Sequence, residues 1–341
     1  MSESLRDYTT LHIGGPAKKF VHATTEAELI DAVSAADSAG EPVLIIGGGS
    51  NVLVGDGGFA GTAIRVETKG NSYAVDACSG GMITVAAGED WDGFVEWIIG
   101  KGFVGVETLS GIPGTVGASP IQNIGAYGHE VSEVIARVRT WDRKAKELKT
   151  LSNSECEFAY RNSRFKKEKD RYVVLDVTFQ LRQGEMSLPI AYKELAQHLG
   201  VELGARALVT DVRKAVLELR SRKGMVINKK DHDTWSAGSF FVNPIVNADV
   251  AATLPSDAPK WPQSDGRVKL SAAWLMEKSG VAKGSAHNGA GVSSKHVLAL
   301  VNNGSATSAD MVELARNAKA AVRKKFGIEL EPEVSFVGCD L

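Results

Sequence analysis

The chain of 341 residues is longer than one ordinary hydrophobic core requires, so we expect two or three domains. Its 39 Lys and Arg residues nearly balance its 41 Asp and Glu residues, and a net charge of −2 without a basic stripe argues against nucleic-acid binding. A hydrophobic content of 43% predicts a packed soluble protein, and no apolar run approaches the ~20 residues of a membrane span.

The N-terminal sequence MSESLRDYTT lacks the apolar core of a signal peptide. The three cysteines, Cys78, Cys156 and Cys339, lie far apart and form no CxxC pair, which argues against a disulfide scaffold and a zinc site. The seven histidines show no metal-ligand spacing. We therefore expect a cytoplasmic protein without a metal site.

The first 70 residues predict a small α/β domain. Thr24–Ala39 has the Thr cap and apolar spacing of a helix, and Gly40 follows its end. The strands expected after it are Pro42–Ile46, Val52–Val54 and Thr62–Val66.

Residues 71–221 predict a second domain. Alternating apolar residues near Tyr73–Val75 and Ile83–Val85 indicate a hairpin, and Trp91–Ile99 is an amphipathic helix. The later elements expected here are strands at Val134–Trp141, Glu147–Leu151 and Tyr172–Leu181 and a helix at Ala207–Ser221.

Residues 222–319 predict a third domain, with helices at Ser271–Lys278 and Ser308–Phe326. The tail Ile328–Val337 alternates like a strand, and we expect residues 320–341 to return to the second domain. The densest basic cluster, Arg220–Lys223, is local and suits a single anionic ligand.

The stretch Ser110–Gly128 combines five glycines and two prolines with several apolar residues and almost no charge. A disordered linker would be more polar, and a core strand would not tolerate this much Gly and Pro. The composition fits an ordered loop against a large flat ligand as well as it fits a buried structural loop. Its length favours function, because structureless loops beyond about 12–15 residues are usually functional or disordered.

The segment Gly47–Asn51 follows a strand but is not a dinucleotide fingerprint, because no helix follows the glycines. No G-K-[ST] is present, which excludes a P-loop. Successive backbone N–H groups in such a turn can bind a pyrophosphate. The alternative is a tight turn between strands.

Three further segments contain groups capable of chemistry. Tyr160–Phe165 contains two arginines beside an aromatic residue, which suits a carboxylate ligand or a solvated basic strand end. Ser236–Pro244 places a serine between glycine and two phenylalanines, as a proton donor or simply a turn into a strand. Glu331–Val334 contains a glutamate that is otherwise an ordinary surface acid.

Together these segments resemble the UDP-N-acetylenolpyruvoylglucosamine reductase (MurB) family over nearly the whole chain. The matching segments are Thr9–Gly15, Gly47–Leu53, Ser110–Gly128, Tyr160–Arg161, Gly238–Pro244, Pro262–Leu275 and Glu331–Val334. The resemblance implies an α+β and α/β multidomain chain with an FAD-binding fold of the vanillyl-alcohol-oxidase (PCMH) type. Residues 1–70 and 71–221 with 320–341 would form the two FAD-binding subdomains, and 222–319 a substrate-binding α+β domain.

The same resemblance implies bound FAD as the cofactor and NADPH as the cosubstrate. One group of residues would hold the pyrophosphate: Gly47, Gly48, Gly49, Ser50, Asn51, Val52 and Leu53. A second group would lie along the flavin: Ile112, Pro113, Gly114, Gly117, Ala118, Ser119, Ile121 and Gly125.

The implied reaction reduces FAD with NADPH and then passes hydride to C3 of the enolpyruvyl ether of UDP-N-acetylglucosamine. Arg161 would stabilise the developing enolate, Ser239 would protonate C2, and Glu333 would assist by hydrogen bonding or by orienting Arg161. The product is UDP-N-acetylmuramate, a peptidoglycan precursor.

The resemblance also implies substrate contacts at Tyr192, Lys223, Asn243, Trp261 and His296. Trp261 stands where the family commonly has tyrosine, and His296 where it commonly has glutamine. These two departures leave the details of nucleotide contact open.

Two alternatives remain at this point. An oxidase on the same FAD fold would often tether its flavin through His or Cys, and the expected flavin loops contain neither. A non-enzymatic UDP-sugar sensor would be expected to lose Arg161, Ser239 or Glu333, and all three are present. We expect small-molecule substrates only, no nucleic acid or membrane partner, and a monomer.

Overall fold

The computed structural model describes residues 3–76 and 80–341, so Cys78 lies outside the described residues. The chain divides into two compact units. Within the described residues, the first unit comprises Ala17–Gly48 and Ala60–Val226, and the second comprises Glu3–Pro16, Gly49–Phe59 and Ile227–Leu341.

The first unit begins with a three-stranded sheet in the order β1 (Ala17–Ala23), β4 (Phe59–Val66), β2 (Val43–Ile46). Strands β2 and β4 are parallel. The predicted helix is confirmed as α1 (Glu26–Ser38), which begins with a capping box between Thr25 and Glu28. Leu29 and Val33 form its buried face, as the apolar spacing indicates.

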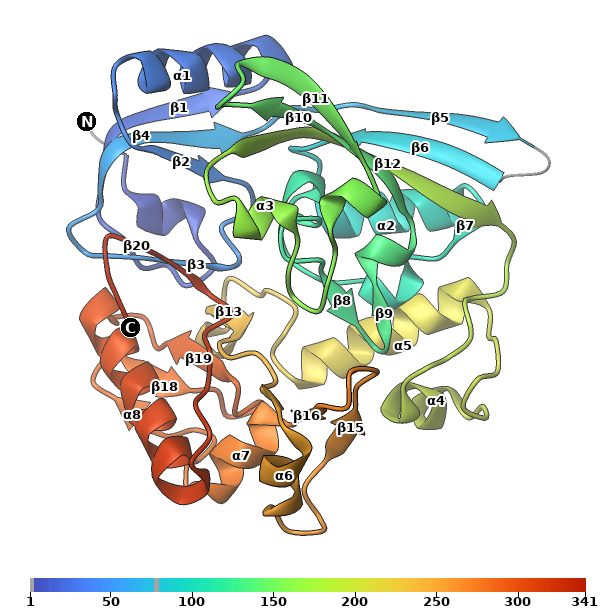
Figure 1. Ribbon diagram of the computed structural model, residues 1–341, viewed down its shortest axis with the longest axis vertical. Coiled ribbons are helices and arrows are strands. Elements are labelled where there is room, and N and C mark those ends of the chain that lie inside the picture. Colours follow the sequence, from blue (N-terminus) through green and yellow to red (C-terminus); the bar gives the residue numbers. More distant parts are fainter. Residues whose placement is uncertain (1–2, 77–79) are drawn as a thin grey trace. The chain divides into compact units, whose positions relative to one another are not determined.

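A larger antiparallel sheet forms the centre of the first unit (Figure 1). Its strand order is β11 (Glu147–Ser152), β10 (Ile135–Asp142), β12 (Tyr172–Gln183), β6 (Gly80–Ala86) and β5 (Asn71–Asp76), and β7 (Phe103–Val104) pairs with the end of β12. The predicted helix here is confirmed as α2 (Trp91–Gly100), and its Trp91 and Phe94 contact Phe179 of β12. This aromatic contact anchors the sheet on α2.

Two helices of the first unit pack on each other apart from that sheet. Helix α5 (Val209–Arg222) confirms the predicted helix, whereas α4 (Lys193–Leu199) was not predicted. Figure 1 shows α4 and α5 close together, and they share a small apolar cluster. The buried members of this cluster are Ile190, Leu195, Ala196, Val212, Ala215, Val216 and Leu219.

The second unit is a smaller α+β structure. Its main sheet has the order β13 (Ser236–Ser239), β19 (Ala299–Asn302), β18 (Ala290–Val292), β17 (Ala286–His287), and helix α8 (Ser308–Phe326) packs on β18 and β19. Helix α7 (Ala272–Lys278) packs on α8. The remaining elements are β14 (Ile245–Val246), β15 (Lys260–Pro262), β16 (Val268–Leu270) and α6 (Ala248–Ala252).

The C-terminal tail lies elsewhere than the sequence predicted. Strand β20 (Ser335–Val337) pairs in parallel with β3 (Val52–Val54), so the tail belongs to the second unit and not with residues 71–221. The regular strand is also shorter than Ile328–Val337. The tail residues Leu330 and Val334, which precede β20, are buried in the core of the second unit. Their burial determines how the tail pairs with β3.

The domain boundaries differ from the expectation in a related way. Residues 17–48 and 60–226 form one compact unit, where two subdomains were expected. The segment Gly49–Phe59 between them belongs to the second unit, in which its strand β3 pairs with β20. The second unit's long segment begins at Ile227, close to the predicted boundary at residue 222.

His129, on the short strand β9 (His129–Glu130), has two hydrogen-bond partners that can only accept. Its Nδ1 lies 2.8 Å from the Glu133 carboxylate and its Nε2 lies 3.0 Å from the Pro189 carbonyl. Both contacts need a protonated ring nitrogen, and the hydrogen bond to Glu133 raises the pKa of His129 above its ordinary value of 6.5. The charged imidazolium therefore joins β9 to the segment before α4.

This linkage has a defined pH dependence. The stabilisation is complete below the unfolded-state pKa of about 6.5 and is lost as the pH rises through the higher folded-state pKa. We expect His129→Gln to lower the free energy of unfolding more at pH ~5.5 than at pH ~9, measured by denaturant titration. His22→Gln, which breaks a more exposed pair with Glu67, should show a smaller difference. A cost for His129→Gln that does not vary with pH would contradict the doubly protonated ring.

Candidate active site

In the first unit, two predicted cofactor segments meet although they are more than 60 residues apart in sequence. A Cβ added to Gly48 would lie 2.4 Å from the Cα of Gly114, and one on Gly47 would lie 2.4 Å from the Thr115 hydroxyl. The backbones therefore approach as closely as glycine allows. Gly47 and Gly48 make this contact, so these two residues and the loop Ser110–Gly128 form a continuous surface in the first unit.

Backbone hydrogen bonds from this loop to the residues after β6 help to hold it in place. Val116 N donates to Glu89 O and Gly117 N donates to Ala87 O, which ties the 3-10 turn Val116–Ala118 to the end of β6. The predicted flavin-contacting residues then divide by exposure: Gly117 and Ser119 are buried, and Ile112, Pro113, Gly114, Ala118 and Gly125 are partly exposed. The Ser119 hydroxyl donates to Val116 O, so it holds the loop.

Ile121 stands out among these residues because its apolar side chain is 40% exposed within a loop that is otherwise packed. Exposed apolar side chains beside glycine backbone suit a flat apolar ligand better than they suit water. Contact of this loop with FAD stays a prediction.

Arg161 lies directly on this loop. Its Nη2 donates to Gly125 O at 2.8 Å, and a Cβ on Gly125 would lie 3.1 Å from Nη1. The backbone of Arg161 has a φ of 50°, a conformation that is uncommon for a residue with a side chain. The structure thus brings the predicted catalytic arginine to the predicted flavin loop.

Asn123 organises the contact between Arg161's turn and the loop, and the sequence analysis did not single it out. Its buried amide Nδ2 donates to Glu130 and to Ala159 O, and its Oδ1 accepts from Ser132 N. Its φ of 48° turns the loop back toward Tyr160–Ser163. An asparagine in a Gly-rich loop is a common turn residue, which is why its pattern drew no attention.

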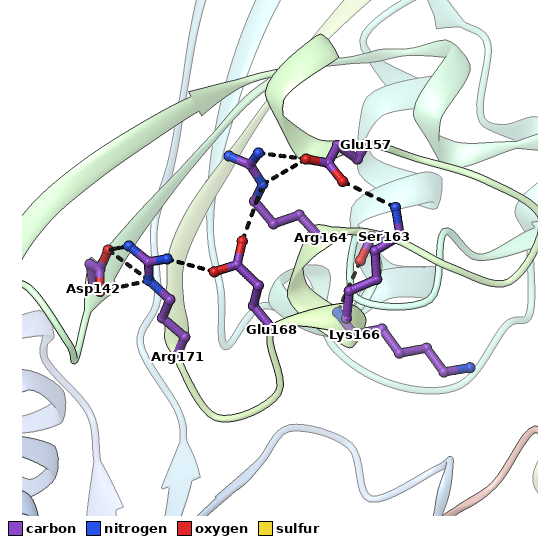
Figure 2. Close-up of polar contacts among 8 residues, drawn as sticks. Asp142, Glu157, Ser163, Arg164, Lys166, Glu168 and Arg171 are labelled. Carbon is purple, nitrogen blue, oxygen red and sulfur yellow. Dashed lines mark hydrogen bonds and ion pairs between the residues drawn. The ribbon is translucent and has the colours of Figure 1, made fainter.

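A series of alternating charges holds the segment that follows Arg161 (Figure 2). Helix α3 (Arg164–Lys167) begins one residue after Ser163, whose hydroxyl caps it. Arg164 pairs with both Glu157 and Glu168, and Glu168 also pairs with Arg171. Arg171 reaches Asp142 of β10, which is almost fully buried. This network fixes the turn to the central sheet, so Arg161 is positioned before any ligand binds.

The predicted substrate residues Tyr192 and Lys223 lie at the α4–α5 pair. Tyr192 is the N-cap residue of α4 and is 42% exposed. Its ring packs edge-to-face on that of Tyr127, in the loop Ser110–Gly128, with 5.6 Å between the ring centroids. Burial raises the pKa of Tyr127 to about 12, so this phenol stays neutral at physiological pH. Lys223 follows α5 and pairs with Glu194 at 2.5 Å.

Arg220 lies one turn before Lys223. Its side chain packs against Gly111 at the start of the loop and donates to Met225 O. Burial lowers the pKa of Arg220 from its usual value, although arginine stays charged. The loop therefore has a second cation close to it, which the sequence analysis grouped only within a local basic cluster.

In the second unit, Ser239 ends strand β13, and Glu333 lies in an adjoining segment just before β20. Ser239 ends β13, opposite Ala299, after Gly238 with a φ of 71° and an irregular register. The next residue, Phe240, accepts at its carbonyl from Glu333 N at 2.8 Å. Phe240 and Phe241 are fully buried and fix this pairing, and both Ser239 and Glu333 are partly exposed.

Gly49 and Asn51, at the end of the turn Gly47–Asn51, lie against the segments that carry Ser239 and Glu333. Asn51 Nδ2 donates to Glu333 O at 3.0 Å, and Thr10 of the Thr9–Gly15 segment binds both Gly49 O and Ser236 O. Gly49 has a φ of 61° and would clash with Tyr8 O if it carried a side chain. Gly49–Leu53 thus packs in the second unit beside Ser239 and Glu333.

The other predicted substrate residues of the second unit are more dispersed. Asn243 Oδ1 accepts from Ala272 N at the start of α7. Trp261 is 41% exposed on β15, and His296 is partly exposed in the turn before β19. Each remains a predicted nucleotide contact.

An open depression of about 580 Å³ lies along α5, but none of the predicted site residues lines it. Within residues 3–76 and 80–341 no cluster of three or more His, Cys, Asp or Glu side chains suits a metal ion. The helices described are also too short or too polar to cross a membrane.

Two family models match separate parts of the chain, and the second begins close to Ile227, where the long segment of the second unit begins. An FAD binding domain matches residues 17–150, and the C-terminal domain of UDP-N-acetylenolpyruvoylglucosamine reductase matches residues 229–337. These matches confirm the expected FAD-binding fold with an added C-terminal domain.

Relatives and solved structures agree over the whole length. The chain is 54% identical to the UDP-N-acetylenolpyruvoylglucosamine reductase of Cutibacterium acnes, covering 99% of this chain and 90% of the relative. It is 50% identical to that of Streptomyces avermitilis, covering 99% and 94%. The crystal structure of the Thermus caldophilus reductase (MurB) superposes with a TM-score of 0.68 at 25% identity, covering 99% of this chain and 98% of that one. The chain therefore belongs to the UDP-N-acetylenolpyruvoylglucosamine reductase family.

Proposed function

We propose that this chain reduces the enolpyruvyl ether of UDP-N-acetylglucosamine to UDP-N-acetylmuramate for peptidoglycan synthesis, with FAD as its cofactor and NADPH as its cosubstrate. Full-length identity of 54% to a named reductase carries this assignment. The oxidase alternative has no comparable support, and the reductase is the function that the family models favour.

The residues present fit FAD. In the first unit the close approach of Gly48 to Gly114 joins the turn and the loop into one surface of glycine backbone, with Ile121 exposed beside it. Bound FAD supplies a hydride carrier between NADPH and the enolpyruvyl double bond. Gly47–Leu53 would hold its pyrophosphate, and the loop residues from Ile112 to Gly125 would lie along its rings and ribityl chain.

Arg161 supplies a fixed positive charge for the negative charge that develops at C2 and on the substrate carboxylate. Carbonyl oxygens of the loop, Gly125 O at 2.8 Å and Asn123 O at 3.5 Å, accept hydrogen bonds from its guanidinium and orient it. A preorganised cation stabilises developing charge without reorganising during the reaction.

Ser239 donates the proton to C2, and Glu333 assists through a hydrogen bond or by orienting its neighbours. The hydrogen bond from Glu333 N to Phe240 O keeps the segments that carry the two residues side by side. A serine hydroxyl is a weak acid, so this role requires a water-poor setting and polarisation by a cation.

We assign Tyr192, Lys223, Asn243, Trp261 and His296 to contacts with the nucleotide portion of the substrate. Trp261 offers an exposed aromatic face for stacking, and Lys223 a cation for phosphate.

We also propose that the enzyme acts in the cytoplasm as a monomer. Through peptidoglycan synthesis it contributes to cell division and cell shape. The described cysteines, Cys156 and Cys339, are free thiols, which suits a reducing compartment.

The proposed activity is tested by half-reactions without oxygen. Purified protein should be yellow, NADPH should bleach its flavin absorption, and the enolpyruvyl sugar nucleotide should restore it. UDP-N-acetylglucosamine, which has no enolpyruvyl double bond, should not restore it. A protein that stays colourless when offered FAD, or reduced flavin that the enolpyruvyl compound leaves bleached, would refute the proposal.

Ser239→Ala separates the two half-reactions. We expect reduction by NADPH at an unchanged rate and reoxidation by the substrate slowed at least about 100-fold, which is the usual scale of general-acid catalysis. Stopped-flow absorbance measures both rates, and Ser256→Ala, an exposed serine of the same unit, is the control. Equal losses in both half-reactions would show that Ser239 is not the proton donor.

Gly48→Ala tests the surface formed by the turn and the loop. The added methyl group lies 2.4 Å from Gly114 Cα, so one backbone must move, at a cost of ~1–3 kcal/mol. We expect a several-fold lower FAD-to-protein ratio after purification and a lower Tm. Gly100→Ala, in the same unit with open space around it, should retain full FAD content. Full occupancy in Gly48→Ala would show that this contact does not shape the FAD site.

A further inference from the structure

Arg65 binds the backbone of the turn that is predicted to hold the FAD pyrophosphate. It lies near the end of β4, where it is in register with Ile46, the last residue of β2. Its Nη1 donates to the carbonyl oxygen of Gly47, the first residue after β2. The guanidinium on one strand therefore holds the chain at the point where it leaves the neighbouring strand.

A peptide between two glycines needs such an anchor. Glycine has no side chain to restrict its φ and ψ, so the peptide that joins Gly47 to Gly48 can turn over at little steric cost. In a trans peptide the C=O and the following N–H point in opposite directions. The contact of Arg65 with Gly47 O therefore selects one orientation of this peptide, and it directs the Gly48 N–H away from Arg65.

The loop Ser110–Gly128 confines the positions of the same two glycines. A Cβ on Gly47 would lie 2.4 Å from the Thr115 hydroxyl, and one on Gly48 would lie 2.4 Å from Gly114 Cα. These close approaches fix where the two residues lie, whereas hydrogen bonding fixes which way their shared peptide faces. Arg65 supplies that hydrogen bond.

The hydrogen bond also changes the donor strength of the Gly48 amide. A charged donor on a carbonyl oxygen polarises the peptide, so that its N–H becomes a better hydrogen-bond donor. The charge of Arg65 is shared with Glu67, whose carboxylate lies 3.8 Å from Nε and 3.0 Å from Nδ1 of His22. Orientation and polarisation of the peptide therefore outweigh long-range attraction of an anion to Arg65.

We propose that Arg65 is a positioning residue of the cofactor site, which holds Gly47 O so that the Gly48 N–H is presented to the FAD pyrophosphate. The inference rests on the proposed function, because it takes FAD as the ligand of this turn. It adds a residue outside Gly47–Leu53 and outside the loop Ser110–Gly128, and this residue acts through the backbone of Gly47.

Arg65→Gln removes the charge and shortens the side chain. Loss of a hydrogen bond from a charged donor is expected to raise the Kd for FAD by about 10-fold. Flavin fluorescence, recorded while FAD is added to the flavin-free full-length chain, measures this affinity. An unchanged Kd in Arg65→Gln would overturn the proposal.

Arg139 provides a matched control. It also lies on a strand of the first unit, at 33% side-chain exposure against 24% for Arg65, and it pairs with Glu26 and Asp176, neither of which belongs to the turn. Arg139→Gln should lower the Tm and leave the Kd for FAD unchanged. An equal rise in Kd in both variants would show that these arginines only stabilise the unit, and the proposal would then be wrong.

Arg65→Lys tests the role by rescue. Lysine keeps a charged donor for Gly47 O, so we expect its Kd for FAD to stay within about 3-fold of the wild-type value. A loss as large as that of Arg65→Gln would contradict the proposed hydrogen bond.

Phosphorus NMR of the bound cofactor gives a readout independent of affinity. The pyrophosphate resonances should move in FAD-saturated Arg65→Gln and should coincide with those of the wild type in Arg139→Gln. Amide hydrogen exchange in the wild type needs no variant, and FAD should slow exchange of the Gly48 N–H. Unmoved resonances in Arg65→Gln, or a Gly48 amide that FAD does not protect, would overturn the proposal.

These outcomes are distinct from failure of the proposed function. If the wild type binds FAD and Arg65→Gln binds it equally well, only the role of Arg65 fails. If the wild type binds no FAD, the proposed function itself fails.

Discussion

The geometry of the first unit depends on the buried amide of Asn123. This one side chain binds Glu130, Ala159 O and Ser132 N, so it closes the loop Ser110–Gly128 on itself and on the turn that carries Arg161. The loop has little regular structure to satisfy its backbone, and each buried polar group left without a partner costs about 1–3 kcal/mol. Asn123 supplies those partners at the point where the chain must reverse.

Two further contacts fix the position of the glycine-rich loop Ser110–Gly128 and of the turn that carries Arg161. Glycine permits the close approach of Gly48 to Gly114, and the chain of ion pairs from Arg164 to Asp142 fixes the turn beyond Arg161. Neither feature would position the arginine alone. Together they hold its guanidinium against Gly125 O, near the end of the loop Ser110–Gly128.

The two cations of the first unit are held in opposite ways. Arg161 donates to carbonyl oxygens of the loop, whereas Lys223 is paired with Glu194. The first arrangement suits stabilisation of charge that develops during a reaction, because the loop backbone fixes the cation in place. The second suits exchange of one anion for another, because the partner is exposed and weakly bound. In the second unit, Phe240 O and the side-chain amide of Asn51 bind the backbone of Glu333 and hold its segment beside that of Ser239.

Local sequence patterns were sufficient to predict most of the helices and strands and the family to which the chain belongs. The capped helices α1 and α7, the amphipathic α2 and the strands of the central sheet follow from side-chain spacing and caps, which act over a few residues. The motif segments were sufficient to indicate the family and its FAD-binding fold. The tertiary structure alone decided that β20 pairs with β3, that Asn123 supports Arg161, and that Glu194 faces Lys223. These contacts join residues that are at least 29 positions apart in sequence, and no local pattern of charge or hydrophobicity encodes such pairings.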